Sequence, residues 1–301
     1  MLKKILIVAF TILIVTSSLA LAAPQEKFDI SLQQWKVKGS FDYYLHDTGS
    51  SQLLSLVSMP QNQNMNILHL KYTPNNRNYV RFQYGITSSG NKGRGSDTDW
   101  QNAGSSTMTD YGTMNFNGNQ KMIAVDFGTV VSKSERKKTS VLWGLSRRDT
   151  TNQISNVVYH LVNGVNVGNL TQTDNGSYLN GTFSGIHIGV ENEYKLNDKI
   201  LLNTGLNTSY LNAKAYGHWA NHLPPWDWEN SGNTLGFDLN IGLIYTFHKN
   251  MMAELGYYYS YAKMTDGKER LDYNNGTSVE YSGIDLGYKQ RGYYFGLNWK
   301  I

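Results

Sequence analysis

Two short stretches of the chain combine residue types that are suited to acid–base chemistry. In the first, Asp97 and Asp99 stand two residues apart, directly before Trp100. Residues i and i+2 of an extended strand share a face, so the spacing predicts two carboxylates that point the same way. Two carboxylates at such close range can share a proton or hold a water between them. An Asx-rich turn is the structural alternative.

The second stretch runs from His218 to His222 and is followed by two prolines and Asp227. In extended backbone, His218, Ala220 and His222 share one face. A histidine there is suited to act as a general base for water, because its ordinary pKa lies near physiological pH. The helical zinc motif also needs a glutamate between its two histidines, which is absent, so we predict no metal. Plain surface histidines are the alternative.

The start of the chain predicts export. Lys3 and Lys4 precede an apolar run from Ile5 to Val15, and the small residues Ala20-Leu21-Ala22 follow. This order predicts a secretory signal peptide over residues 1–22. A retained membrane anchor is the alternative, although the run is short for a span. The mature protein would then comprise residues 23–301.

Composition narrows the class of protein. The 301 residues contain no cysteine, which excludes disulfides, thiolate metal sites and a cysteine nucleophile. A mean hydropathy of -0.45 excludes a bundle of membrane helices. The formal charge of +4 falls by two when the signal lysines are removed, and no basic stripe indicates a nucleic-acid partner. We also predict no cofactor.

Beyond the signal, apolar residues recur with a period of two. Every odd position from Leu235 to Phe247 is apolar or aromatic, and similar alternation marks residues 80–84, 123–127, 186–190 and 251–261. A secreted β-sandwich would alternate too. Long alternating segments with aromatic residues at their ends fit the strands of a transmembrane barrel better.

Connection lengths test this prediction independently. We expect ten strands, near residues 28–46, 51–71, 77–89, 112–132, 138–154, 178–194, 198–214, 232–247, 250–264 and 278–301. Every second connection is short, and four of the others are long loops, at 90–111, 155–177, 215–231 and 265–277. This asymmetry is typical of outer-membrane barrels. The prediction is an all-β protein: one ten-stranded antiparallel transmembrane β-barrel with long extracellular loops.

A barrel of this size can be filled by its own side chains, which argues against a general porin. The residues that we expect to face inward carry both signs of charge and would form ion pairs there. They are Arg81, Gln83, Asp126, His187, Glu191, Asp238, Glu254, Asp285 and Lys289.

The mature sequence resembles the omptins, ten-stranded outer-membrane barrels that act as endopeptidases at their extracellular mouth. The resemblance rests on Asp29-Ile30-Ser31-Leu32, on Asp97-Thr98-Asp99-Trp100, on Thr109-Asp110 and on the order of strands and loops. It implies that a water held between the aspartate pair and a His–Asp pair attacks a peptide carbonyl, with Asp97, Asp99 and His222 as catalytic residues. It also implies location in the bacterial outer membrane, loops facing outside, and lipopolysaccharide as a lipid partner.

The sequence departs from the omptin pattern at the second catalytic pair, an Asp-x-His after the seventh strand. Placing its histidine on His222 puts the aspartate on Ala220, and an ungapped match puts the aspartate on His218 and the histidine on Ala220. Neither register keeps the pair. Such a loss of the orienting carboxylate costs about 10⁴ in rate in serine proteases. Either Asp227 or His218 would have to compensate.

Two functions therefore stay open. The first is an omptin-like endopeptidase that cleaves peptide or protein substrates, and the second is a catalytically inactive barrel that serves as an adhesin or surface-binding protein. The resemblance implies acidic groups that contact basic substrate residues. Candidates for substrate binding are Asp42, Asp47, His218 and Asp227. Convergence of Asp97, Asp99 and His222 across the mouth would favour the endopeptidase.

Overall fold

The computed structural model describes residues 27–47, 52–100, 107–173, 176–220, 225–273 and 276–301. The predicted signal peptide lies outside these residues. Thirteen strands form one sheet: β1 (Lys27–His46), β2 (Leu53–Pro60), β3 (Gln63–Thr73), β4 (Asn78–Ser89), β5 (Asn91–Trp100), β6 (Met108–Lys133), β7 (Lys137–Val162), β8 (Val165–Gln172), β9 (Tyr178–Lys195), β10 (Ile200–Trp219), β11 (Trp226–His248), β12 (Met251–Tyr273) and β13 (Ser278–Lys300).

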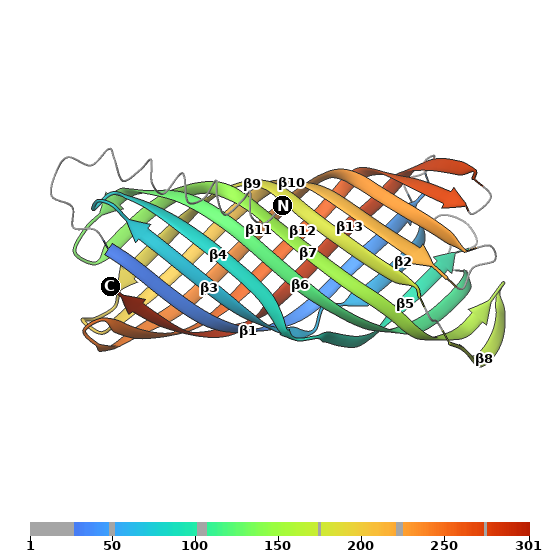
Figure 1. Ribbon diagram of the computed structural model, residues 1–301, viewed down its shortest axis with the longest axis horizontal. Coiled ribbons are helices and arrows are strands. Elements are labelled where there is room, and N and C mark those ends of the chain that lie inside the picture. Colours follow the sequence, from blue (N-terminus) through green and yellow to red (C-terminus); the bar gives the residue numbers. More distant parts are fainter. Residues whose placement is uncertain (1–26, 48–51, 101–106, 174–175, 221–224, 274–275) are drawn as a thin grey trace.

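The sheet closes into a barrel of ten antiparallel strands, as the sequence predicts (Figure 1). Strands β2 and β3 both pair with β1 and together make one wall element, and β4 and β5 do the same along β6. Strand β8 pairs only with β7 and forms a hairpin arm beside the ring. Pairing of β1 with β13 closes the barrel. No helix long and apolar enough to span a membrane occurs among the described residues.

The two ends of the barrel differ in their connections. At one end, the turn end, four connections of two to four residues join successive strands, and the chain returns there at Ile301. Asn75 Oδ1 accepts the backbone N–H groups of Arg77 and Asn78, at 2.9 and 2.8 Å, which fixes the first turn. The predicted short turns are confirmed. The opposite end, the mouth end, contains β2, β5 and β8.

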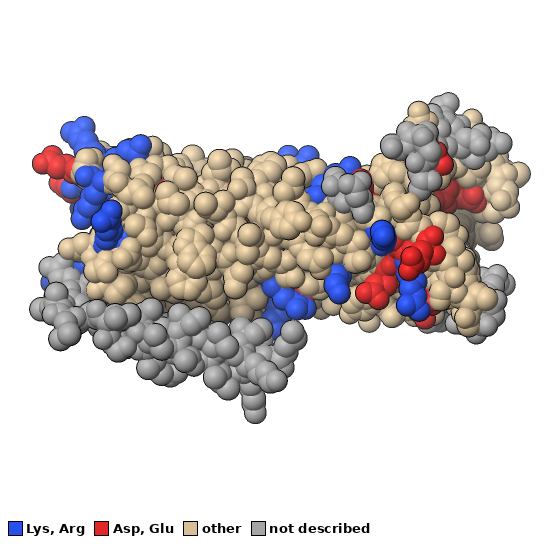
Figure 2. All heavy atoms as spheres, turned by 90° about the horizontal axis from the view of Figure 1, so that it is seen from above, with Lys and Arg blue, Asp and Glu red and all other residues tan. Residues whose placement is uncertain are grey.

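An apolar band surrounds the middle of the barrel. In Figure 2 the visible face is free of charged side chains over a broad middle zone, and lysine, arginine and acidic residues flank it on both sides. Such a band is what the hydrocarbon core of a membrane requires. Its members are exposed, outward-facing apolar and aromatic side chains: Trp143, Leu145, Ile186, Ile188, Val190, Leu206, Tyr210, Leu235, Phe237, Leu239, Ile241, Leu243, Leu255, Tyr293 and Phe295.

Toward the mouth end, the apolar face of the long strands changes from outside to inside. On β6, Val125 faces outward in the apolar band, whereas Phe116 is buried inside and Asn117 is exposed outside. Phe41 of β1 meets Phe183 of β9 across the interior, with ring centroids 6.0 Å apart. The buried apolar side chains form one cluster, the mouth core: Phe41, Val57, Met59, Met114, Phe116, Ile154, Val157, Leu179, Phe183, Leu211, Ala213, Ala215, Trp228, Ala262, Met264, Leu271, Ile284, Leu286 and Tyr288.

The expected long loops are largely strand in the structure. Strand β5 lies within residues 90–111, β8 within 155–177, and β10, β11 and β12 extend well into 215–231 and 265–277. The reason is the reversed alternation: polar residues face outward there, and small or apolar ones face inward. The barrel wall thus continues beyond the apolar band.

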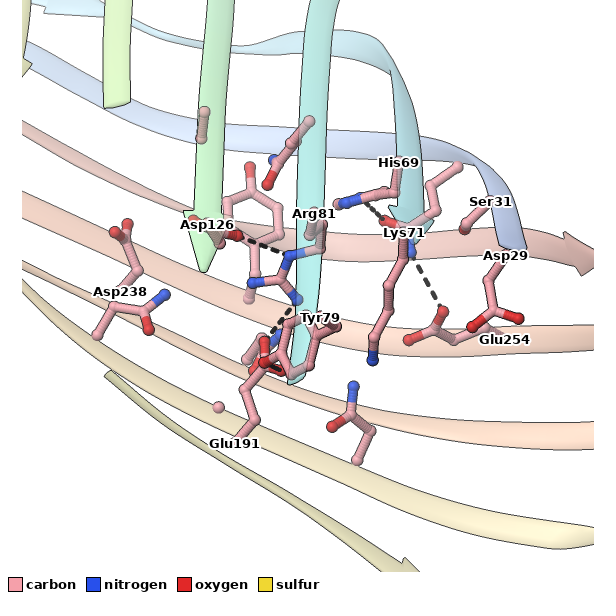
Figure 3. Close-up of a pocket in the computed structure, with 18 of the residues that line it drawn as sticks. Asp29, Ser31, His69, Lys71, Tyr79, Arg81, Asp126, Glu191, Asp238 and Glu254 are labelled. Carbon is pink, nitrogen blue, oxygen red and sulfur yellow. Dashed lines mark hydrogen bonds and ion pairs between the residues drawn. The ribbon is translucent and has the colours of Figure 1, made fainter. Parts of the chain in front are cut away.

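The turn-end half of the interior is polar, as predicted (Figure 3). A cavity of about 690 Å³ lies there, and Arg81 stands between two carboxylates, 2.7 Å from Asp126 and 2.5 Å from Glu191. His187 contacts Asp126 at 2.6 Å, and Glu254 accepts hydrogen bonds from Gln33, Tyr294 and Asn298. These pairs stabilise the lumen by satisfying its buried charges.

Two of the residues expected in the lumen lie on the outer wall. Asp285 contacts Lys263 at 3.2 Å and His46 at 3.3 Å on the outside, and Lys289 is exposed. Even positions of β13 face inward, from Ile284 to Tyr294. Tyr293 and Tyr294 are adjacent aromatic residues, so the sequence did not reveal whether the odd or the even positions of β13 face the interior.

Candidate functional site

The aspartate pair of β5 faces the interior of the mouth end. Asp97 lies opposite Val57 of β2 and Gly112 of β6, and Val57 belongs to the mouth core. Asp99 shares the face of Asp97, because two residues separate them on one strand. Both carboxylates are partly exposed. They therefore stand on the inner wall, beside the mouth core, where a solute can reach them.

A third carboxylate joins the pair from the next strand. Asp110 of β6 lies directly opposite Asp99 of β5. Directly opposed residues of an antiparallel pair have Cβ atoms about 4.5–5.5 Å apart, and like charges there destabilise the sheet. Burial, followed by the carboxylates of Asp99 and Asp110, raises the pKa of Asp97 to about 8. Such a cluster is typical of a functional site, since it costs stability.

Glu269 of β12 adds acidity farther around the inner wall. The Tyr43 hydroxyl donates a 2.6 Å hydrogen bond to its carboxylate. Burial raises the pKa of Glu269, and burial together with the charges of Glu269, Asp97 and Asp99 raises the pKa of Tyr43 well above its usual value. Tyr43 therefore stays neutral and lies between Glu269 and the aspartate pair.

The wall that would hold the omptin His–Asp pair has a different composition. Inward positions on β10 are odd, as Leu211, Ala213 and Ala215 show by their burial. The last two inward positions are Gly217 and Trp219. A Cβ atom at Gly217 would lie 2.4 Å from the Trp228 ring, so a side chain there needs that ring to move. No aspartate or histidine occupies the described inward positions at this end of β10.

His218 and Asp227 pair with each other on the outer wall. His218 Nδ1 lies 2.7 Å from Asp227 Oδ1, and the two residues are opposite each other on β10 and β11. His218 is two residues from the exposed Tyr216 on β10, so its side chain faces outward, and Asp227 faces outward with it. Both residues therefore face away from Asp97. His222 lies outside the described residues, and its convergence with the aspartate pair stays a prediction.

The remaining substrate-binding candidates lie away from the aspartate pair. Asp42 accepts hydrogen bonds from Ser40 and Ser58, at 2.7 and 2.6 Å, on the outer wall. Asp47 follows β1, and its backbone N–H donates to the carbonyl of Gln52 at 2.8 Å. The structure thus brings together Asp97 and Asp99 but not Asp42 with them.

Sequence reasoning gave no role to Asp110 and missed Glu269. Asp110 was noted only as part of Thr109-Asp110, and Glu269 falls in a stretch expected to be a loop. The strand register brings Asp110 opposite Asp99, and the hydrogen bond from Tyr43 locates Glu269 on the same inner wall. Within the described residues, no group of three or more His, Asp and Glu residues is arranged to hold a metal ion.

Comparison with solved structures finds a strong likeness in fold. The outer membrane protease OmpT from Escherichia coli matches with a TM-score of 0.81 and 12% sequence identity, over 94% of this chain and 100% of that chain. The translocator domain of the autotransporter NalP from Neisseria meningitidis matches with a TM-score of only 0.41, at 10% identity, over 97% of this chain and 94% of that chain. No family model and no curated protein matches the sequence. The chain therefore has an OmpT-like barrel fold.

Proposed function

We propose that the protein is an omptin-like barrel of the outer membrane whose mouth end binds basic peptide segments without cleaving them. The observation that carries this proposal is the cluster of Asp97, Asp99 and Asp110 on one inner face. Within the part of the chain that is described, neither Asp97 nor Asp110 has a lysine or arginine partner within 4 Å. A cationic ligand would relieve their mutual repulsion.

The surrounding side chains fit a peptide. Four aromatic side chains pack against the mouth core and remain partly exposed: Tyr43, Tyr159, Trp219 and Tyr273. Aromatic rings of this kind provide large contact surfaces for the apolar parts of a peptide. Carboxylates set among them favour arginine, whose planar guanidinium can bind two oxygens at once.

Hydrolysis is disfavoured by the opposite wall. An inward Asp-x-His pair on β10 would have to occupy odd positions, and Gly217 and Trp219 supply neither a base nor a carboxylate. On the described part of β10, the aspartate pair therefore faces no histidine or carboxylate that could orient an attacking water.

Endopeptidase activity is the second candidate. It is favoured by the raised pKa of Asp97, because a proton held between Asp97 and Asp99 at neutral pH resembles the shared proton of aspartic protease dyads. The OmpT-like fold supports it as well. In that case His222, which lies outside the described residues, would be the base that acts with Asp97 and Asp99 on the water.

Mass spectrometry of peptides separates the two candidates. The refolded mature protein would be incubated, with lipopolysaccharide present, with decapeptides that carry an Arg-Arg pair or a Ser-Ser pair. We expect retention of intact Arg-Arg peptide and no new termini. Cleavage that Asp97→Asn abolishes would instead establish the endopeptidase. Equal retention of both peptides would contradict an acidic binding site.

A further inference from the structure

A groove on the outer wall of the mouth end has a lining unlike that of the inner site. Its volume is about 640 Å³, within the range of small-molecule sites. None of its lining residues carries a charge, and most bear amide, hydroxyl or phenol groups. They are Asn117, Gly118, Asn119, Thr151, Gln153, Ile154, Gly176, Ser177, Tyr178, Asn180 and Tyr216.

The strand register arranges the polar side chains in two parallel rows. In the first row, Asn117 of β6 lies opposite Gln153 of β7, which lies opposite Tyr178 of β9. The second row crosses four strands: Asn119 of β6 lies opposite Thr151 of β7, Thr151 opposite Asn180 of β9, and Asn180 opposite Tyr216 of β10. Four strands spaced about 4.8 Å apart span about 14 Å. The groove thus has the dimensions of a short oligosaccharide.

Tyrosine rings form one end of the groove. The rings of Tyr178 and Tyr216 meet edge to face, with centroids 6.2 Å apart and an interplanar angle of 75°. The His218 ring stacks beside Tyr178, at 6.0 Å and 24°, and Asp227 holds His218 by its 2.7 Å contact. The outer His–Asp pair therefore acts as a positioning pair for Tyr178.

At the other end, amide groups are available for a ligand. The side chains of Asn117 and Gln153 are exposed, and neither takes part in the side-chain hydrogen bonds found among the described residues. Each amide offers two donors and an acceptor. Neighbouring hydroxyl groups of a sugar need both hydrogen-bond donors and acceptors, which amides supply. A charged ligand, by contrast, would find no side chain of opposite charge in the lining.

We propose that this groove binds a neutral saccharide. A pyranose ring has one face of C–H groups, which packs against tyrosine rings, and a rim of hydroxyl groups, which pairs with amides. The proposal is independent of peptide binding at the mouth, since the groove lies on the opposite face of the wall. The saccharide is either soluble or the sugar portion of a membrane glycolipid.

Ligand-observed NMR with soluble neutral tetrasaccharides of glucose, mannose, galactose and N-acetylglucosamine tests the proposal on the mature protein in detergent micelles. We expect at least one to bind and Tyr216→Ala to weaken it about tenfold or more, which corresponds to about 1.4 kcal/mol. Tyr281→Ala, which removes an exposed tyrosine from β13, is the matched control and should leave binding unchanged.

Asn117→Ala and Gln153→Ala provide a second test with exposed residues whose loss should not prevent folding. Each should weaken the same sugar severalfold. No binding of any tetrasaccharide, binding that Tyr216→Ala, Asn117→Ala and Gln153→Ala all retain, or displacement of the sugar by an uncharged peptide would overturn the proposal. Vesicles with and without lipopolysaccharide distinguish the sources: competition by lipopolysaccharide vesicles alone assigns the groove to glycolipid sugar, and its absence assigns it to soluble sugar.

Discussion

The two halves of the barrel interior have opposite chemistry. In the turn-end half, Arg81 pairs with Asp126 and Glu191 inside, and apolar side chains such as Ile188 face outward. In the mouth-end half, Phe116 and its neighbours are buried inside, and amides such as Asn117 face outward. The same strand can run through both halves, because its apolar residues occupy outward-facing positions in one half and inward-facing positions in the other.

The difference shows what surrounds each half. A wall in lipid is stable with apolar side chains outside and satisfied polar groups inside. A wall in water is stable with the reverse arrangement, like any soluble β-protein. The mouth end is thus a water-exposed domain built on membrane strands, and its mouth core gives the inner carboxylates a rigid support.

The largest expected effect comes from removing the central cation of the polar half. Arg81→Ala leaves Asp126 and Glu191 without their shared partner, and we expect a loss of about 3–5 kcal/mol in the free energy of unfolding. Urea unfolding in lipid vesicles measures it. Arg291→Ala, on the exposed outer wall, is the control and should change stability by less than about 0.5 kcal/mol. Equal effects would contradict the ion-paired lumen.

The apolar half is tested by shortening a buried side chain. Met114→Ala should lower the free energy of unfolding by about 2–5 kcal/mol, because it opens a cavity in the mouth core. Its neighbour Asn115 is exposed, so Asn115→Ala should cost less than about 0.5 kcal/mol. If the two variants unfold alike, the interior of the mouth end is not a packed core.

The pH dependence of peptide binding sharpens the contrast at the inner site. Asp97 is protonated below its raised pKa of about 8 and gains its charge as pH rises through that value. Affinity for an arginine peptide should therefore increase severalfold between pH 6.5 and 9, values that bracket this pKa, while arginine itself stays charged. Isothermal titration calorimetry measures the affinity at each pH. The same increase in Asp97→Asn would show that another group titrates.

The smallest expected effect concerns the outer pair. His218→Ala should leave arginine-peptide affinity within about twofold of the wild type, since His218 faces away from the aspartates. The same variant should weaken saccharide binding, because Tyr178 loses its stacking partner. A large loss of peptide affinity would place His218 in the inner site. Fluorescence titration with a labelled peptide is sufficient.

Much of the barrel was predictable from the sequence. Every odd position from Leu235 to Phe247 is apolar or aromatic, and the short turns at Asn75 and Asn197 carry Asx residues, so the ten strands and the turn end follow directly. The mouth-end strands could not be predicted from the sequence, because small and polar residues such as Gly93, Gly95 and Asn117 have low strand propensity. In addition, the apolar residues of the long strands move there from outward-facing to inward-facing positions.

The candidate site was only half accessible from the sequence. The i, i+2 spacing placed Asp97 and Asp99 on one face. The register was needed to bring Asp110 opposite Asp99, and the parity of β10 was needed to turn His218 outward. A histidine two residues from an alanine gives no indication of which face it occupies.

The most direct test compares two ways of removing acidity from the mouth end. Affinity for the Arg-Arg decapeptide would be measured in the wild type, in Asp97→Asn/Asp99→Asn and in Asp227→Asn, whose carboxylate is on the outer wall. The inner double variant should lose affinity by about tenfold or more, and the outer variant should bind like the wild type. Equal losses in both, or none in the inner variant, would contradict an inward-facing acidic site.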